Sequence, residues 1–394
     1  MKKKILLVAS SLVTGGLEKC LINLADNLDY DRYEVDLYLF NEGRALLPKL
    51  NKNVNLLPDS PYYALLYNRG VGKSTLGLLK KGKIRFAIHR LARFVRARLG
   101  RVKMTEADFE IMRRTMLTDL GHYDVAIGFE EGTACYYVAE CVSADKKIGW
   151  IHTDISKITT NRALDERAFS VLDKVVTVSD NSLNKLKQAF PDLAHKFVRI
   201  TVPALMNYDE VNALAGEPNN YFGTAKRILS VGRLVELKGF HLCVEATKML
   251  LDDGFDVRWF VAGEGDYRAN IEAEIDRLGV GDRFVLLGNC ANPYTYMKGA
   301  DVCVQPSSYE GYSVAVFEEK YFGKPVVVTG IPSNLEMIED GVNGIVVERT
   351  AQSIYEGVKK LLLDEDYAKA LGARPVKDGT DNATIIKEIE ELFE

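Results

Sequence analysis

Short apolar runs alternate with helical segments along the chain, and this alternation occurs twice. In the first half we expect β-strands at 3–10, 33–40, 123–129, 146–153 and 174–179. The pattern restarts after the middle of the chain, where strands are expected at 227–233, 256–265, 284–288, 300–306, 325–330 and 344–348. Strands that take turns with helices form parallel sheets covered on both faces. The sequence therefore predicts an α/β protein of two doubly wound, Rossmann-like domains that face a central cleft.

A segment rich in Pro, Asn and Gly lies between the two halves, at residues 202–224, and its composition is typical of a linker. A chain of 394 residues is long for a single hydrophobic core, so two domains are expected. We place the first domain at 1–203, the second at 204–380 and a helical tail at 381–394.

The net charge of −4 conceals two halves of opposite sign. Residues 1–203 contain 32 Lys+Arg against 23 Asp+Glu, or +9, and the remainder contains 19 against 32, or −13. Nucleic-acid binding is not expected, because the basic surplus is confined to one part of an otherwise acidic chain.

Much of the positive excess lies between residues 60 and 105, where no acidic residue is present. Apolar residues recur at helical spacing between the arginines of this stretch, at Ile84, Ile88, Leu91, Ala92, Val95 and Leu99. A basic amphipathic helix of this kind suits an anionic membrane surface. Residues 80–103 are therefore a candidate membrane contact; a solvated helix packed on its own domain is the alternative.

Several features exclude other classes of protein. No run of eighteen apolar residues is present, so no transmembrane helix is expected. The basic and apolar start, 1–16, imitates a secretion signal, but a strand followed by a glycine pair explains it better. The stretch GVGKST at 70–75 resembles the end of a P-loop, but that motif needs glycine where Tyr67 stands. The six cysteines lack CxxC spacing, which suits reduced thiols in the cytoplasm.

Six polar or glycine-bearing turns follow directly on predicted strands. Ligands of doubly wound sheets bind beyond the carboxyl ends of the strands. Purely structural turns would be found at both edges of a sheet, so this one-sided distribution is the strongest functional signal in the chain. The turns are TGGLEK at 14–19, HTDIS at 152–156, GRLVELKG at 232–239, GEGDY at 263–267, SSYEGYS at 307–313 and GIPSN at 330–334.

The turn at 307–313 leads into an apolar helical pattern, and Ser313 is its candidate N-cap. The amides of Tyr312, Ser313 and Val314 would then point out of the helix start, close to Gly311. A helix N-terminus of this kind binds anions, and each charge is stabilised by roughly 0.3–2 kcal/mol. A diphosphate fits such a site.

Two glutamates flank this helix start. Glu318 lies just over one turn into the helix, where it could accept hydrogen bonds from two neighbouring hydroxyls, as on a ribose. Glu310, in the loop ahead, could do the same for a sugar ring. The alternative for Glu318 is an ordinary exposed helix acid, but its apolar neighbours Val316 and Phe317 favour a buried edge.

Arg233 and Lys238 supply positive charge after another strand of the same domain. Two cations that converge on a leaving diphosphate would stabilise the charge that develops there. An Arg and a Lys in a loop are usually solvated, and only their position beside a candidate anion site favours a function.

These motifs, in this order, resemble the retaining glycosyltransferases of family four, which have the GT-B fold. The similar stretches are GGLEK, WIHTD, VGRLVELKG, GEG and EGYSVAVFEE followed by GKPVVVT. Glu310 and Glu318 match that family's Glu-x7-Glu signature, and the resemblance runs from the first strand to residue 347. The stretches RYEVDLYLFNEG, YDVAIGFEEG and KKIGWIHTD further resemble members that extend bacterial capsule, exopolysaccharide or teichoic acid chains.

The resemblance implies a role for each matching residue. Arg233 and Lys238 would hold the donor diphosphate, and Glu318 would bind the ribose. Glu310 and the amides after it would hold the donor sugar, which His152 would reach from the first domain through its side chain or its backbone carbonyl. The donor-binding set is expected to comprise Gly15, Gly16, Gly232, Gly288, Asn289, Gly311, Tyr312, Ser313, Val314 and Glu318.

Other implications concern the first domain and the tail. Gly15 and Gly16 would let the first loop approach the donor closely, and the nucleobase would lie near 288–292. Asp154 would either take part in the site or cap a helix. By analogy with the fold, the acceptor would bind the first domain, and the tail at 381–394 would pack back on that domain.

The resemblance also implies a mechanism. No carboxylate can be assigned as a covalent nucleophile, and the family favours same-face attack, in which the leaving phosphate accepts the acceptor's proton. No metal is expected, because the DxD match at 29–31 lies at the wrong sheet edge and the acidic run at 364–366 lies in a terminal helix loop. We expect a metal-independent hexosyltransferase, with a UDP-sugar as substrate rather than a cofactor, in the cytoplasm or on the inner face of the cell membrane.

The acceptor is expected to be a saccharide or a lipid-linked saccharide. A non-catalytic partner subunit of the same fold and a sugar-nucleotide epimerase are the alternatives. The sequence does not determine the donor sugar, the linkage or the oligomeric state.

Overall fold

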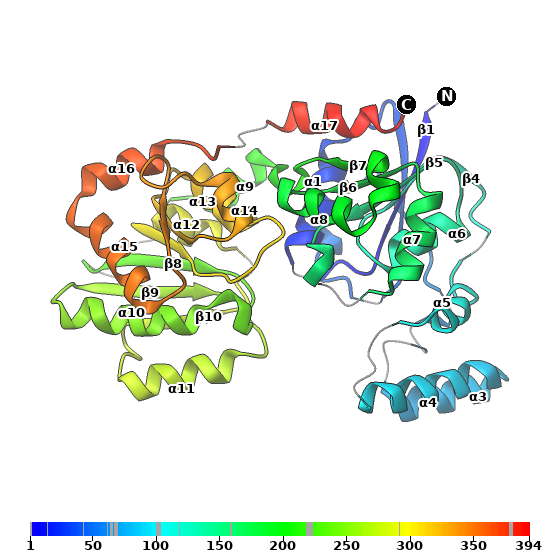
Figure 1. The fold of residues 1–394 in the computed structure, drawn as a ribbon, viewed down its shortest axis with the longest axis horizontal. Coiled ribbons are helices and arrows are strands. Elements are labelled where there is room, and N and C mark those ends of the chain that lie inside the picture. Colours follow the sequence, from blue (N-terminus) through cyan, green and yellow to red (C-terminus); the bar gives the residue numbers. More distant parts are fainter. Residues whose placement is uncertain are drawn as a thin grey trace. The chain divides into compact units, whose positions relative to one another are not determined.

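The computed structural model describes residues 2–394 except 14, 42, 61, 64–65, 67–69, 100–103, 118, 158–159, 218–223, 291 and 378–380. The chain divides into two compact units (Figure 1). Unit 1 comprises Met1–Leu205 and Asp381–Glu394, and unit 2 comprises Met206–Thr380. Tyr67, the end of the candidate membrane stretch at 100–103 and part of the expected linker lie outside the described residues.

Unit 1 is built on a parallel sheet of seven strands in the order β3-β2-β1-β4-β5-β6-β7. β1 pairs with β2 on one side and with β4 on the other, so the order of the strands reverses at the centre of the sheet. The strands are β1 (Lys3–Ala9), β2 (Tyr33–Leu39), β3 (Val54–Leu56), β4 (His122–Gly128), β5 (Ser143–Ile151), β6 (Lys174–Thr177) and β7 (Phe197–Arg199). Five of the seven strands coincide with apolar runs from which they were predicted, and β3 and β7 do not.

The helices of unit 1 connect these strands, and the central strands are apolar on both faces because helices cover both sides. Aromatic side chains fill the core on one face, with Tyr38 against Tyr137 at a ring separation of 5.3 Å. The helices are α1 (Gly16–Asn27), α3 (Val71–Lys80), α4 (Ile84–Arg98), α5 (Glu106–Arg113), α6 (Thr133–Cys141), α7 (Arg162–Val171), α8 (Asp180–Ala189) and α17 (Asn382–Glu391).

The tail of the chain, α17, packs on unit 1. Glu390 forms an ion pair with Arg32 at 2.8 Å, and the ring of Phe393 meets Tyr33 edge to face at 5.6 Å. Asn382 hydrogen-bonds Asn27 at the end of α1. The last helix is therefore part of unit 1, and the first unit ends its continuous stretch at Leu205.

Unit 2 is built on a parallel sheet of six strands in the order β10-β9-β8-β11-β12-β13. The strands are β8 (Lys226–Val231), β9 (Val257–Ala262), β10 (Phe284–Gly288), β11 (Val302–Gln305), β12 (Val326–Thr329) and β13 (Ile345–Val347). The helices are α9 (Tyr208–Ala215), α10 (Phe240–Asp252), α11 (Arg268–Leu278), α12 (Tyr294–Gly299), α13 (Val314–Tyr321), α14 (Pro332–Met337), α15 (Ala351–Leu363) and α16 (Glu365–Ala373). All six predicted strands are present.

The expected linker is only partly a linker, and this prediction was wrong for its middle. Asn207 caps α9 by accepting a hydrogen bond from the Glu210 amide, and Val211 and Ala215 are buried. This helix packs on α12, where Asn292 donates a 2.8 Å hydrogen bond to the Leu214 carbonyl. Local capping and burial therefore outweigh a composition rich in Asn.

A helix is predicted around residues 84–99, and α4 confirms it. The chain adds α3 in front of it, and the two helices lie side by side (Figure 1). Across the described part of the chain, no helix combines the length and apolar character needed to cross a bilayer.

Candidate functional site

Unit 2 brings the predicted donor residues of its own sequence to one edge of its sheet, while Gly15 and Gly16 belong to unit 1. The strand order reverses between β8 and β11, which lie side by side at the centre. Ligands of doubly wound sheets bind at such switch points, beyond the carboxyl ends of the strands. The loop 232–239 leaves β8 there, and the loop 306–313 leaves β11. Arg233 and Lys238 lie on the first loop, and Glu310 lies on the second.

Lys238 and Glu310 are in direct contact. The Lys238 ammonium forms an ion pair with the Glu310 carboxylate, and the Ser307 hydroxyl donates a 2.8 Å hydrogen bond to the same carboxylate oxygen. The two side chains are 16% and 14% exposed, so solvent and salt screen the pair only weakly. The fold thus brings into contact two site residues that were predicted from separate motifs.

The loops of this edge approach one another through their backbones. Gly239 has a φ of +74°, and a Cβ there would lie 2.4 Å from the Pro306 carbonyl oxygen. A Cβ at Gly263 would lie 1.9 Å from the Gly232 carbonyl oxygen. No side chain can be accommodated at either position, so the glycines of VELKG and GEG are required by this contact.

The start of α13 confirms the predicted N-cap position with one difference. Ser313 is the N-cap residue, but its hydroxyl makes no capping hydrogen bond. Tyr312 and Ser313 are buried, while Gly311 and Val314 are half-buried. The first amides of a helix need acceptors from elsewhere when the cap side chain does not supply one. The arrangement leaves this helix start able to bind an anion close to Glu310.

Glu318 is buried, so the alternative of an ordinary exposed helix acid is wrong. Only 5% of the residue is exposed, and the Tyr294 hydroxyl donates a 3.0 Å hydrogen bond to its carboxylate. Tyr294 begins α12 and was not identified from the sequence. It holds Glu318 in one orientation.

Arg233 differs from Lys238. Arg233 is an exposed residue, and it forms no ion pair with any residue that the structure describes. The aliphatic part of Lys238 lies over Gly232, because a Cβ at Gly232 would be 3.4 Å from the Lys238 Cε. One cation of the loop is therefore paired inside the protein, and the other is available to a ligand.

The expected nucleobase region lies at the end of β10. The Gly288 carbonyl accepts a 2.9 Å hydrogen bond from the Gly263 amide, which ties this loop to the one after β9. Gly288 has a φ of +75°, and a Cβ there would lie 3.2 Å from a carboxylate oxygen of Glu264. Asn289 is exposed.

Two buried ionisable residues of α13 were missed from the sequence. Glu319 is fully buried, accepts a 2.9 Å hydrogen bond from Gln305, and burial raises its pKa to about 8. Lys320 donates three hydrogen bonds to backbone carbonyls, two of them on α16, and burial lowers its pKa to about 8. These two side chains fix α13 against the sheet and against α16. Helical spacing alone assigns them to a polar surface, which explains the miss.

In unit 1, Gly15 is the N-cap of α1 and Gly16 is its first residue. The Gly15 backbone has a φ of −172°, an extended conformation that any residue can adopt. The fold itself therefore does not require a glycine at this position, and close approach of a ligand remains the predicted reason for it.

His152 follows β5 at the carboxyl edge of the same sheet. Its backbone amide donates a 3.0 Å hydrogen bond to Glu131, which also accepts one from the Thr153 hydroxyl at 2.5 Å. The imidazole lies 5.0 Å from the ring of Phe129 in a tilted arrangement, and burial lowers the pKa of His152 to about 4, so the ring is neutral at pH 7. Its Nε2 is buried and has no hydrogen-bond partner among the described residues.

The stretch YDVAIGFEEG contains Glu130 and Glu131, which were not predicted to be site residues. They follow β4, which lies between β1 and β5, so they share one sheet edge with His152. The Ser10 hydroxyl, after β1, contacts the Glu130 carboxylate. Burial raises the pKa of Glu130 to about 7. Their position directly after a central strand could have indicated a role in the site.

Asp154 acts as a helix cap, which was one of its two predicted roles. It is buried, and its carboxylate accepts a 2.8 Å hydrogen bond from the Ser156 amide at a short 3-10 turn.

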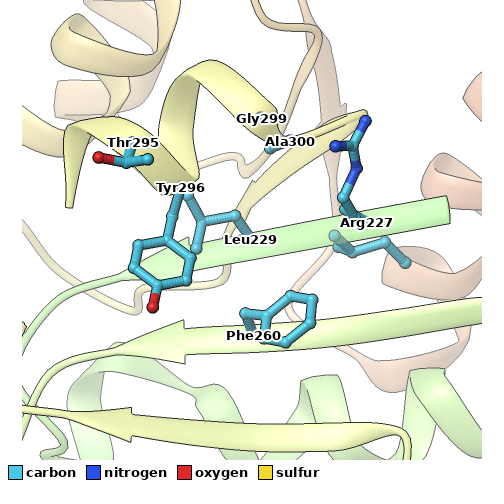
Figure 2. A pocket seen from close by; sticks show the side chains of 8 residues that line it. Arg227, Leu229, Phe260, Thr295, Tyr296, Gly299 and Ala300 are labelled. Carbon is cyan, nitrogen blue, oxygen red and sulfur yellow. The ribbon is translucent and has the colours of Figure 1, made fainter. Parts of the chain in front are cut away.

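A pocket of unit 2 lies apart from these residues (Figure 2). Leu229, Phe260 and Tyr296 line it together with Arg227, at the amino-terminal part of β8. Arg227 is already paired with Asp301 at 3.1 Å. The pocket is therefore apolar and lies away from the carboxyl edge of the sheet.

Among the residues that the structure describes, no group of three or more His, Cys, Asp or Glu side chains is arranged to hold a metal ion. The DxD match at 29–31 lies between α1 and β2, at the amino edge of the sheet, where the Asp29 carbonyl accepts hydrogen bonds from the Arg32 and Tyr33 amides.

Residues 216–376 match the family described as glycosyl transferases group 1. An uncharacterized glycosyltransferase of Methanocaldococcus jannaschii is 35% identical over 156 residues, which cover 39% of this chain and 40% of the relative. The capsular polysaccharide biosynthesis glycosyltransferase CapM of Staphylococcus aureus is 25% identical over 168 residues, which cover 41% of this chain and 44% of CapM. The chain thus spans less than half the length of each of these two curated relatives.

A likeness to a solved structure extends over the whole chain. The Anabaena protein HepE, in complex with UDP and glucose, is 18% identical with a TM-score of 0.68, and the match covers 99% of this chain and 98% of HepE. At this level of identity the likeness concerns the fold. The chain has the GT-B fold, and its residues 216–376 are similar to the glycosyl transferases group 1.

Proposed function

We propose that this protein is a retaining, metal-independent glycosyltransferase that moves a hexosyl residue from a nucleotide sugar to a saccharide or lipid-linked acceptor in cell-surface polysaccharide synthesis. The observation that carries the proposal is the Lys238–Glu310 ion pair, which lies beside the start of α13 at the switch point of unit 2. This unit is also the part of the chain that matches the family.

The donor would bind with its diphosphate between Arg233, Lys238 and the first amides of α13. Arg233 would supply the exposed charge, and Lys238 would supply a second charge that Glu310 holds in place. Glu318, oriented by Tyr294, is suited to accept hydrogen bonds from two ribose hydroxyls. A uridine diphosphate is the nucleotide part that we propose, and HepE, which has the same fold, was solved with UDP.

The mechanism would depend on stabilising the leaving group. When the bond between the anomeric carbon and the donor phosphate breaks, negative charge grows on the diphosphate, and two cations with a helix start stabilise that charge. Glu310 is already neutralised by Lys238, which makes it a poor nucleophile and suits it to hold sugar hydroxyls. The acceptor hydroxyl would give its proton to the departing phosphate oxygen on the same face.

The acceptor would bind the carboxyl edge of unit 1. Ser10, Glu130 and the neutral ring of His152 offer hydrogen-bonding groups of the kind that recognise sugar hydroxyls. Glu131 positions the backbone of His152 and Thr153. A lipid-linked acceptor would bring the protein to the inner face of the cell membrane, where residues 80–103 are the candidate contact.

A thermal-shift panel of UDP-, GDP- and ADP-sugars tests the donor site. A UDP-sugar should raise the melting temperature of the wild type, and Glu318→Ala should lose most of that shift. Glu356→Ala is the matched control, because Glu356 is an exposed acid on a helix of the same unit. If no nucleotide sugar shifts the wild type, the donor-site assignment is wrong.

Product analysis with the bound donor then tests the activity. Release of UDP with transfer or hydrolysis of the sugar supports the proposal. Donor binding without any turnover would support a non-catalytic partner subunit, and an epimerised nucleotide sugar would support the epimerase.

A further inference from the structure

An apolar stripe lies exposed on α3 and α4 of unit 1. Among the described residues, seven of the thirteen large apolar side chains that are exposed lie between residues 76 and 99. Isolated exposed apolar residues are normal on protein surfaces, but a contiguous group marks an interaction site. The stripe consists of Leu76, Leu79, Ile84, Ile88, Leu91, Val95 and Leu99.

The spacing places the α4 members of the stripe on one face of the helix. Ile84, Ile88, Leu91, Val95 and Leu99 follow one another at intervals of four, three, four and four residues, which is the period of one helical face. They are 47–68% exposed. The face is therefore continuous along the whole helix and is not covered by the described part of unit 1.

The other faces of the hairpin are occupied by the protein. Leu78 of α3 and Ala87 of α4 are buried together in a small core with Leu66. Asp108 of α5 forms an ion pair with Arg96 and lies 3.3 Å from His89. These contacts fix the rotation of α4, so the exposed stripe is not the helix's own packing face.

Positive charge borders the stripe. Lys73, Lys80, Lys81, Arg85 and Arg98 are exposed, and residues 60–105 contain no acidic residue. Arg85 and Arg98 lie on opposite sides of the α4 face by helical position. An exposed apolar face bordered by cations is complementary to an anionic bilayer, which has an apolar interior and anionic headgroups.

Two other occupants fit less well. A second copy of the chain would bring two acid-free, cationic surfaces together, and like charges would oppose that contact. If only solvent covered the stripe, seven large apolar side chains in a segment of 24 residues would stay in contact with water, which is unfavourable.

We propose that the α3–α4 hairpin docks the protein on an anionic lipid surface, with the stripe buried among the acyl chains and the bordering cations on the lipid headgroups. The helices lie in the plane of the interface rather than across it, because none of the described helices is long and apolar enough to span a bilayer. The docking surface is separate from the donor residues of unit 2 and does not depend on the proposed reaction.

Vesicle co-sedimentation of the full chain tests this inference. Vesicles of equal parts phosphatidylcholine and phosphatidylglycerol should bind the protein, vesicles of phosphatidylcholine alone should bind it at least about tenfold more weakly, and about 1 M salt should weaken the anionic binding. Ile88→Ser with Leu91→Ser should weaken partition at least about tenfold, because two apolar side chains no longer enter the bilayer.

Matched variants separate the stripe from general surface effects. Val171→Ser with Leu363→Ser removes two exposed apolar side chains elsewhere and should leave binding unchanged. Arg85→Gln with Arg98→Gln should weaken binding about fivefold for each lost cation, while Lys52→Gln with Lys187→Gln should have little effect. Because all exchanged residues are exposed, the melting temperature reports whether each variant is folded.

Two outcomes would overturn the proposal. One is equal partition of the wild type and the Ile88→Ser, Leu91→Ser variant. The other is a wild-type dimer in sedimentation velocity that this variant converts to monomers, which would make the stripe an interface between copies. The melting-temperature shift by a UDP-sugar should be the same in the stripe variant and the wild type, so loss of vesicle binding and loss of donor binding are scored separately.

Discussion

The carboxyl edges of the two sheets carry opposite chemistry on the same kind of scaffold. In unit 2 the edge has two cations, one of them paired with Glu310, beside a helix start. In unit 1 the corresponding edge has Glu130, Glu131 and a neutral histidine. The first is suited to a diphosphate, and the second is suited to uncharged hydroxyls.

This contrast runs against the charge of the two halves. The cationic edge belongs to the half of the chain with a net charge of −13, and the acidic edge belongs to the half with +9. Much of the positive excess of the first half lies on the α3–α4 hairpin instead. The net charge of each half therefore does not predict the charge of its strand-end loops, which face any small ligand.

The largest expected effect concerns the cations of unit 2. Arg233→Gln with Lys238→Gln should lower the rate of sugar transfer about 100- to 1,000-fold, because charge that develops on the leaving diphosphate is no longer stabilised. Single-turnover kinetics measures this rate. Lys248→Gln is the control and should be close to wild type, because Lys248 lies on α10 with a half-buried side chain that pairs with Asp252 rather than with the donor loops. If the double variant transferred sugar at the wild-type rate, the cations of unit 2 would not stabilise the leaving group, and the proposed difference between the two edges would be wrong.

Glu130→Gln tests the acidic edge of unit 1. We expect transfer to fall about 10- to 100-fold, because a sugar hydroxyl loses a charged acceptor, while the melting-temperature shift by the donor stays unchanged. Since the pKa of Glu130 is raised to about 7, the wild-type rate should also vary between pH 6 and 8, and this variation should be absent from the variant. Loss of the donor shift in Glu130→Gln would show that the two edges do not divide donor and acceptor.

Glu319→Gln tests the buried acid beneath the donor edge. The folded state holds a proton on Glu319 up to about pH 8, whereas the unfolded chain releases it near pH 4.5, so rising pH destabilises the folded wild type across this window. The variant lacks this titration. Urea unfolding at pH 5 and pH 8 should show that the variant gains roughly 3–4 kcal/mol relative to the wild type at the higher pH. A constant difference at both values would mean that Glu319 is ionised in the folded protein.

The smallest expected effect concerns the orientation of Glu318. Tyr294→Phe removes one hydrogen bond to its carboxylate and should weaken UDP binding about threefold to tenfold in calorimetry. Tyr296→Phe, on the same helix and in the pocket of Figure 2, should not change it. Stronger binding by Tyr294→Phe would indicate that the tyrosine competes with the ribose for Glu318.

Much of the fold could be predicted, because most strands are apolar runs followed by turns. β3 and β7 escaped prediction because each is a three-residue strand at the edge of the sheet. The helix α9 was missed because it lies in a segment rich in Pro, Asn and Gly that indicates a linker, whereas burial of Val211 and Ala215 within unit 2 decides its structure.

The candidate site was predicted residue by residue but not as contacts. Lys238 and Glu310 were each identified, yet their ion pair joins loops far apart in the sequence. Glu130 was not identified, because a glutamate after a strand is common in solvated loops and its burial depends on the surrounding elements. The amphipathic pattern of α4 was visible, but only the structure shows that its apolar face is the exposed one.

The central claim is that the Arg233–Lys238 loop holds a diphosphate, and the ratio of UDP to uridine affinity tests it most directly. Calorimetry should show that the wild type binds UDP far more tightly than uridine. Arg233→Gln with Lys238→Gln should abolish most of that preference and leave uridine binding unchanged. A double variant that retains the full preference for UDP would contradict the account.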